Sequence, residues 1–169
     1  MSQKNKNILI GGLLAIVLVM AVGYAAFATQ LNISGSANVT STWDVHIKSI
    51  TAGTPVGTAV SKSATVGESK LTANFETDLV APGDSLTYTV TVENGGTLDA
   101  KLSELTFTPG SSAAITYSSA GIAKDDVIAA GATKAFTVTV TYNASVTSQP
   151  AQADTTSSLA MVMSFVQNK

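Results

Sequence analysis

The sequence has no cysteine, no arginine and a single histidine, His46. The absence of cysteine excludes disulfides, thiol nucleophiles and cysteine zinc sites. His46 has no second histidine to complete a zinc site, so we interpret it as structural. Asp125 and Asp126 carry carboxylates, which are calcium ligands in many proteins, but no EF-hand loop pattern surrounds them. The sequence therefore predicts no catalytic residues, no cofactor and no metal site, and a protein that is not an enzyme.

Positive charge is also scarce. Beyond residue 28 the chain carries seven lysines against eleven acidic residues, and seven minus eleven leaves a net charge of −4. Domains that bind nucleic acid present a clustered basic surface. We therefore predict that the protein does not bind nucleic acid.

Residues 1–28 have the composition of an export leader. Lys4 and Lys6 precede an uncharged, apolar run that extends from residue 8 to residue 28. Small residues allow cleavage after Ala28 or after Ala26. A retained signal anchor is the alternative, because the run reaches ~30 Å as a helix, enough to span a bilayer. Both predict a secreted or cell-surface protein that contacts the membrane only through the leader.

Residues 29–169 are predicted to form one all-β domain, because apolar and polar residues alternate along most of its length. The clearest strand is Ser85–Glu93, where β-branched threonines separate the apolar residues Leu86, Tyr88, Val90 and Val92. Other predicted strands cover 43–48, a weak segment near 58–60, 71–75, 98–107 with a bulge near Ser103-Glu104, 115–117, 136–140 and 159–165. Frequent turns between eight to ten strands predict an antiparallel β-sandwich that is jelly-roll-like, preceded by an N-terminal hydrophobic leader helix.

One weak internal repeat links two of these strands. Val127–Gly131 followed by Phe136–Val140 repeats the pattern of Leu79–Gly83 followed by Tyr88–Val92. In each copy an apolar pair leads to a glycine turn and then to a strand that alternates with threonine. We interpret the two arms as belonging to two sheets packed face to face.

The segment 31–39 is a further candidate strand close to the N-terminus. Its residues Leu31, Ile33, Ala37 and Val39 share one parity, with small polar residues between them. Asn32, Asn38 and Asn143 each begin an Asn-x-Ser/Thr triplet, which is a glycosylation acceptor only in a host that modifies asparagine.

Two stretches together resemble a known family. Tyr24-Ala25-Ala26-Phe27 precedes the alternating segment, and Pro82-Gly83-Asp84 precedes an alternating strand that ends at Asn94-Gly95-Gly96. Both resemble the TasA/camelysin family of exported bacterial proteins and the related archaeal bundling pilins. The last strand, Leu159–Gln167, is also similar to the closing strand of that family.

The resemblance implies a jelly-roll domain, cleavage after Ala26, and assembly by donation of an N-terminal strand to the next subunit. Leu31, Ile33, Ala37 and Val39 would form this polymerisation strand. Camelysin-like members have carried a metallopeptidase label, which this chain does not support because it lacks a set of zinc ligands.

The expected function is therefore that of a structural subunit of an extracellular surface fibre, pilus or biofilm matrix. Its expected partner is another copy of the same chain, joined head to tail, with surface glycans or matrix polymers as further candidate partners. The alternative is a membrane-tethered monomeric domain for adhesion or carbohydrate binding. The two hypotheses differ in the fate of the leader and in whether segment 31–39 pairs within its own chain.

Overall fold

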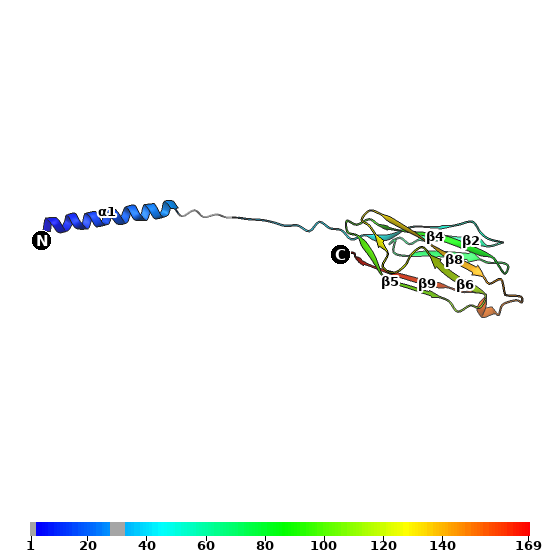
Figure 1. Ribbon diagram of the computed structural model, residues 1–169. Coiled ribbons are helices and arrows are strands. Elements are labelled where there is room, and N and C mark those ends of the chain that lie inside the picture. Colours follow the sequence, from blue (N-terminus) through cyan, green and yellow to red (C-terminus); the bar gives the residue numbers. More distant parts are fainter. Residues whose placement is uncertain (1–2, 28–32) are drawn as a thin grey trace. The chain divides into compact units, whose positions relative to one another are not determined.

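The computed structural model describes residues 3–27 and 33–169. The chain divides into two units, Met1–Val39 and Thr40–Lys169. The first unit contains one helix, α1 (Gln3–Phe27), and the described residues that follow it, 33–39, form neither helix nor strand (Figure 1). The second unit contains the β-structure.

Helix α1 is the apolar helix expected of the leader. Lys4 and Lys6 lie in its first turns, and no other charged residue occurs in its 25 residues. Its segment Gln3–Met20 is long and apolar enough to cross a membrane. Ala26 lies in the last turn of the helix, whereas Ala28 lies outside the described residues. The helix is compatible with a signal sequence and with a membrane anchor.

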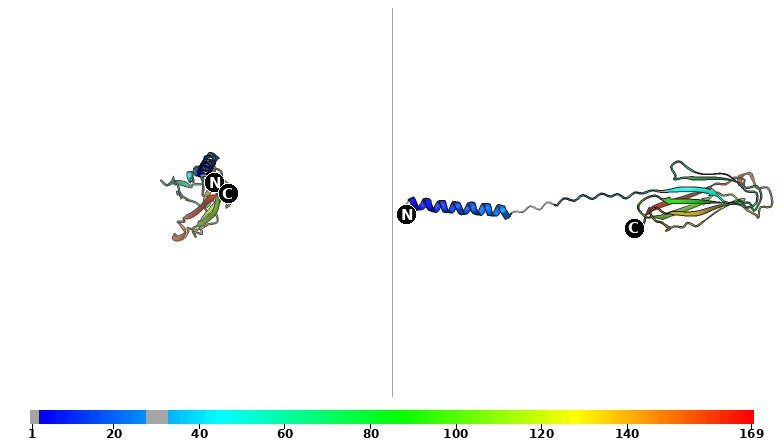
Figure 2. Two further views of the ribbon diagram at one scale, coloured as in Figure 1. Left: turned by 90° about the vertical axis from the view of Figure 1, so that its left-hand side faces the viewer. Right: turned by 90° about the horizontal axis from the view of Figure 1, so that it is seen from above.

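The second unit is built entirely from antiparallel strand pairs, as expected. The described residues contain nine strands: β1 (Val45–Ala52), β2 (Val60–Val66), β3 (Ala73–Asp78), β4 (Ser85–Asn94), β5 (Ala100–Pro109), β6 (Ile115–Ala120), β7 (Val127–Ile128), β8 (Thr133–Tyr142) and β9 (Leu159–Gln167). A short 3-10 helix, η1 (Gln152–Asp154), precedes β9. The strands form a four-stranded sheet β1-β4-β8-β6, a two-stranded sheet β2-β3 and a three-stranded sheet β7-β5-β9. Figure 2 shows the ribbon from two further sides.

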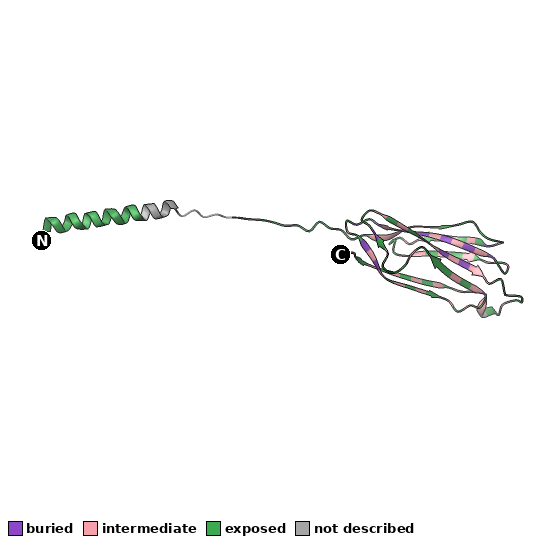
Figure 3. Cartoon of the chain, viewed as in Figure 1, coloured by how far each residue is buried: buried purple, intermediate pink, exposed green. Residues whose placement is uncertain are grey.

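Strands β4 and β8 are the centre of the four-stranded sheet. Tyr88 lies opposite Val138 and Val90 opposite Phe136, so the apolar faces of the two strands coincide. Residues alternate between half-buried and buried along β4, and likewise in β8 from Phe136 to Thr141 (Figure 3). The predicted inward face is confirmed by the seven buried residues Leu86, Tyr88, Val90, Val92, Phe136, Val138 and Val140.

The hydrophobic core lies between the four-stranded sheet and the other two sheets. Partly buried side chains of β2, β3 and β9 pack against the buried face of β4 and β8. Sheets of this kind are stable only when such an apolar face is covered by another layer.

The interpretation of the internal repeat is wrong in one respect. The strands of its two copies, β4 and β8, are hydrogen-bonded neighbours in one sheet and do not belong to two facing sheets. Both copies use the glycine in the same way, since Gly83 has φ 96° and Gly131 has φ 73°. An L-residue with a side chain rarely adopts such values, so glycine is the residue that turns the chain into each strand.

Several strand boundaries differ from expectation. The weak strand near residues 58–60 instead begins at Val60, and Leu71 precedes β3 and is exposed. The bulge in β5 is confirmed between Leu102 and Glu104. A second bulge, in β1 between Ile47 and Ser49, has no sequence signal such as glycine.

A candidate interface between two sheet edges

Strands β3 and β9 each have one edge without a strand partner among the described residues. Strand β3 pairs with β2 alone, and β9 pairs with β5 alone. The unpaired N–H and C=O groups of such an edge are able to bind a further strand.

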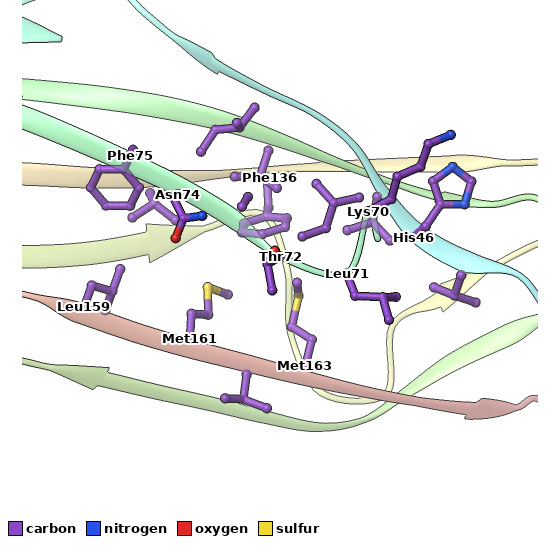
Figure 4. Close-up of a pocket in the computed structure, with 18 of the residues that line it drawn as sticks. His46, Lys70, Leu71, Thr72, Asn74, Phe75, Phe136, Leu159, Met161 and Met163 are labelled. Atoms are coloured by element: carbon purple, nitrogen blue, oxygen red, sulfur yellow. The ribbon is translucent and has the colours of Figure 1, made fainter. Parts of the chain in front are cut away.

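The two free edges border an apolar groove of about 430 Å³. One wall is the start of β3, Ala73–Phe75, and the other is the inward side of β9. In Figure 4, Leu159, Met161 and Met163 point from β9 toward Phe136. The groove therefore lies over the centre of the core, where β4 and β8 form its floor.

Burial differs between the floor and the walls of this groove. The floor residues Val90 and Phe136 are 6% and 3% exposed. The inward side chains of β9 are only half-buried, although their parity is that of core residues. Leu71 and Val162, at the mouth of the groove, are 69% and 58% exposed. The floor is therefore buried, whereas the β9 wall and the mouth of the groove are only partly covered.

A second cavity of about 590 Å³ lies along the same edge of β3. It is lined by the rest of β3 and the residues that follow it, by Ile115 and Tyr117 of β6, and by 155–157, which precede β9. Phe75 lines both cavities and therefore marks the point where one meets the other. We call the two cavities together the β3–β9 groove.

The residues along the groove show that its walls run in opposite directions. Ala73 lines the first cavity and Val80 the second, whereas on the other wall Phe165 lines the first and Thr155 the second. Strands β3 and β9 are therefore antiparallel to each other across the groove. A single strand placed between them would be parallel to one and antiparallel to the other.

The first cavity lies toward the end of the unit where the chain enters it, which we call the entry end. There the N–H of Thr42 donates to the Thr97 hydroxyl, and the N–H of Thr97 donates to the carbonyl of Thr42. The C-terminus lies at the same end, because the N–H of Asn168 donates to the carbonyl of Asp99 (Figure 1). The second cavity, with Val80 and Thr156, lies toward the opposite end, the far end.

Tyr88 and Phe75 fix β3 over the four-stranded sheet. Their rings are 4.5 Å apart between centroids. The Tyr88 hydroxyl is within hydrogen-bond distance of the Thr77 hydroxyl, at 2.8 Å, and donates to the carbonyl of Glu76 at 3.0 Å. A buried tyrosine with a satisfied hydroxyl holds its surroundings in place, so this wall of the groove is preformed.

Asp84 holds the far end of β3. Its carboxylate accepts four hydrogen bonds, from the N–H groups of Thr58, Val80 and Ala81 and from the Thr58 hydroxyl, all between 2.8 and 2.9 Å. These donors, first of all the N–H groups of Ala81 and Thr58, hold the pKa of Asp84 well below its usual range. The Pro-Gly-Asp turn is therefore a structural element of the domain.

Asn94 ties the four-stranded sheet to β7. Its fully buried side chain donates to the carbonyls of Leu98 and Ile128 and accepts from the N–H of Gly96. The Asn94-Gly95-Gly96 motif is thus explained by a buried side chain whose hydrogen bonds are satisfied.

His46 lies at the entry end in a cluster of charged groups. Its Nδ1 is 2.9 Å from an oxygen of Asp44, and its Nε2 is 3.4 Å from an oxygen of Glu93. Lys48 contacts the other Glu93 oxygen at 2.9 Å and, through this bond, lowers the pKa of Glu93. The cluster links β1 to β4, and His46 also lines the first cavity of the β3–β9 groove.

The acidic pair that was considered for calcium is engaged by lysines. Asp125 contacts Lys101 at 2.7 Å, and Asp126 contacts Lys134 at 3.3 Å. In the part of the chain that the structure describes, no group of three or more His, Asp or Glu side chains is arranged to hold a metal ion.

The predicted polymerisation strand lies in the first unit. Ile33, Ala37 and Val39 belong to no strand, and Ile33 and Val39 are 93% and 92% exposed. Leu31 lies outside the described residues, as does Asn32. Of the other glycosylation candidates, Asn38 is exposed, whereas Asn143 is half-buried and accepts hydrogen bonds from the N–H and hydroxyl of Ser145.

Sequence reasoning identified β9 as the last strand, but it made no prediction of which strands lie beside it. It missed that β3 and β9 have no strand between them. The sequence carries only an indirect signal, namely that residues 51–69 are rich in Gly, Thr, Ser and Ala and show a weak strand pattern.

Comparison with protein-family models, with curated proteins and with solved structures gave no match to this chain.

Proposed function

We propose that the protein is the structural subunit of an extracellular fibre, in which the segment 31–39 of one subunit fills the β3–β9 groove of the next. The observation that carries the proposal is an apolar groove, with a β9 wall that is only half-buried, between two unpaired strand edges. An inserted strand would satisfy both edges with backbone hydrogen bonds, fill the groove with alternate side chains and cover its β9 wall.

The N-terminal segment has the properties that such a strand needs. Its apolar residues share one parity, and in the described part of the segment, 33–39, they are exposed and unpaired. Leaving them in water is unfavourable, by about 1.5–3 kcal/mol for a side chain as large as isoleucine. The same chain therefore carries an exposed segment with alternating apolar residues and two neighbouring strand edges without partners among the described residues.

Insertion would also complete the fold. The order β2-β3-inserted strand-β9-β5-β7 would form one sheet facing β1-β4-β8-β6. We propose that this completed domain is a β-sandwich of jelly-roll kind, as the resemblance to the TasA/camelysin family implies. Because the donor and acceptor surfaces differ, the contact is head to tail, and its repetition gives an open filament.

The proposal places the β-unit outside the cytoplasm. Helix α1 would direct export and would be removed after Ala26 or Ala28, leaving segment 31–39 near a new N-terminus. Intact mass measurement of the protein from its native surface distinguishes the two cleavage positions. In this proposal the protein binds its own copies, contacts the membrane only before cleavage, and has no catalytic role. Surface glycans or matrix polymers remain candidate ligands of the assembled fibre.

Deletion of residues 27–39 tests this proposal. We expect the truncated protein to fold, because every described strand and the whole core lie in Thr40–Lys169. It should form no fibres by negative-stain electron microscopy. A synthetic peptide of residues 27–39 should raise its melting temperature, because a ligand of the folded state stabilises it by mass action. Normal fibres from the truncated chain would contradict the proposal and leave the tethered adhesion domain as the better hypothesis.

A further inference from the structure

We infer the direction and register of the donated strand, an inference that rests on the proposed function. It lies parallel to β3 and antiparallel to β9, with Ile33 toward the entry end of the acceptor, Val39 toward the far end and Gly35 beside Phe75. Three features of the described residues are used: the point where the chain enters the β-unit gives the direction, the reach of the tail argues against self-insertion, and a match with Phe75 gives the register.

The first feature is the place where each chain enters its own β-unit. Thr42 is held at the entry end by its two hydrogen bonds with Thr97. The tail of a subunit therefore leaves from its entry end. In a filament whose subunits share one axial direction, this tail reaches the far end of the next subunit first. Its residues nearest Thr42 then lie at that far end, and its earlier residues lie toward the entry end.

The second feature is the reach of the tail, which separates donation from self-insertion. A tail folded back into its own groove would have to enter at the entry end, with Val39 there. Asn38 is four residues from Thr42, a span of at most ~14 Å. Strand β9 has nine residues, a length of ~30 Å, and Thr156 lies beyond its far end. Asn38 therefore reaches Thr156 only in a neighbouring subunit.

The third feature is a match between Gly35 and Phe75. Ile33, Gly35, Ala37 and Val39 have the same parity, so in a strand they all face the groove floor. Phe75 lines both cavities and occupies the place between them. The position on the donor that meets this ring must lack a side chain, and Gly35 is the glycine on the groove-facing side.

The two cavities suit the side chains on either side of Gly35. The cavity at the entry end is lined mostly by aliphatic and methionine side chains, which accept the large apolar Ile33. The cavity at the far end combines Leu79, Val80 and Tyr117 with polar side chains such as Thr155, and accepts the smaller Ala37 and Val39. The reverse direction would place the larger side chain in the more polar cavity.

Cysteine cross-linking tests the direction, and the chain is a clean background because it has no cysteine of its own. One exported variant carries Asn38→Cys with Thr156→Cys, and a matched variant carries Asn38→Cys with Val162→Cys. All three positions are exposed, so neither variant disturbs the core. Oxidised fibres of the first variant should give a ladder of covalent multimers on non-reducing electrophoresis, and those of the second should give none.

The alternative outcomes are distinct. A ladder from the Val162 variant would show the opposite direction, and an internally cross-linked monomer of that variant would show self-insertion; either result overturns the inference. Fibres without a ladder from either variant overturn the register. Failure of the proposed function itself has another signature, namely fibres that form after deletion of residues 27–39.

Substitution of Gly35 tests the register independently. Gly35→Val should raise the protein concentration needed for assembly at least tenfold, because the added side chain meets Phe75. The matched control is Ser36→Val, which adds a similar side chain on the opposite face. Apart from its chain neighbours, no described atom lies within 4 Å of a Cβ placed on Gly35, and Ser36 is exposed, so neither substitution should change the melting temperature of the monomer. Equal effects of the two substitutions on assembly would overturn the proposed place of Gly35.

Discussion

Replacement of Ile33 by alanine should weaken assembly without weakening the domain. Ile33 is 93% exposed in the single chain and becomes buried in the groove of the neighbour if the proposed assembly is correct. The substitution removes three carbons, and each buried methylene contributes about 0.8 kcal/mol. The expected loss is therefore about 2.4 kcal/mol per subunit contact. At 1.4 kcal/mol per factor of ten, the concentration at which fibres form should rise about 50-fold.

Two measurements check this prediction. Sedimentation of fibres over a concentration series gives the residual soluble protein, and thermal unfolding of the monomer gives its stability. Ser34→Ala is the control, because Ser34 has the opposite parity and faces away from the groove. The reasoning would be refuted if Ile33→Ala left the soluble concentration unchanged, if the control had the same effect, or if Ile33→Ala lowered the melting temperature of the monomer.

Two further predictions concern the β-unit itself. Val90→Asp should prevent folding because it places an unpaired charge in the core, whereas Thr89→Asp on the opposite face of the strand should cost little stability. Circular dichroism and thermal melting compare the two variants. Similar behaviour of both would show that the inward face of β4 is assigned wrongly. Asp84 has a lowered pKa in the folded state, so its stabilising contribution is present above its ordinary pKa of 3.8 and is lost as the pH falls below that value. The Asp84→Asn variant should therefore melt at a lower temperature than the unmodified protein at pH 7, and it should lose less stability than the unmodified protein on acidification. If the melting temperatures of the two proteins fell in parallel with decreasing pH, this role of Asp84 would be contradicted.

The central strands were predictable because their pattern is local. In β4 every second residue from Leu86 to Val92 is apolar, and a strand buried on one face requires this alternation. The bulge in β5 was equally visible as a change of parity between Leu102 and Leu105. Such features depend on neighbouring residues alone.

The arrangement of the sheets was not predictable in the same way. Strand pairing joins residues far apart in the chain, as with Tyr88 and Val138, and the repeat that relates β4 to β8 does not reveal that they are neighbours. The groove depends on β3 and β9 lacking a strand between them. Met161 and Met163 would alternate with polar or exposed residues in the same way whether β9 lay in a closed core or beside a missing strand. The sequence therefore could not distinguish these two arrangements of β9.

The buried polar groups were only partly recognisable. Pro82-Gly83-Asp84 was identified as a turn, but its role depends on Thr58, which lies 26 residues earlier. The sequence likewise places Asn94 at the end of a strand, but does not reveal that its side chain donates to the carbonyl of Ile128, 34 residues later. Turn propensity predicts the backbone at such sites and leaves the distant partner unspecified.

Hydrogen exchange of monomer and fibre tests most directly the claim that a neighbouring subunit fills the β3–β9 groove. If a strand is inserted there, backbone amides of β3 and β9 should exchange more slowly in fibres than in the monomer, because their free edges acquire hydrogen bonds. Strands β1 and β6 provide the control, since they form the outer edges of the four-stranded sheet and should change little. Slower exchange at β1 or β6, with β3 and β9 unchanged, would contradict the account.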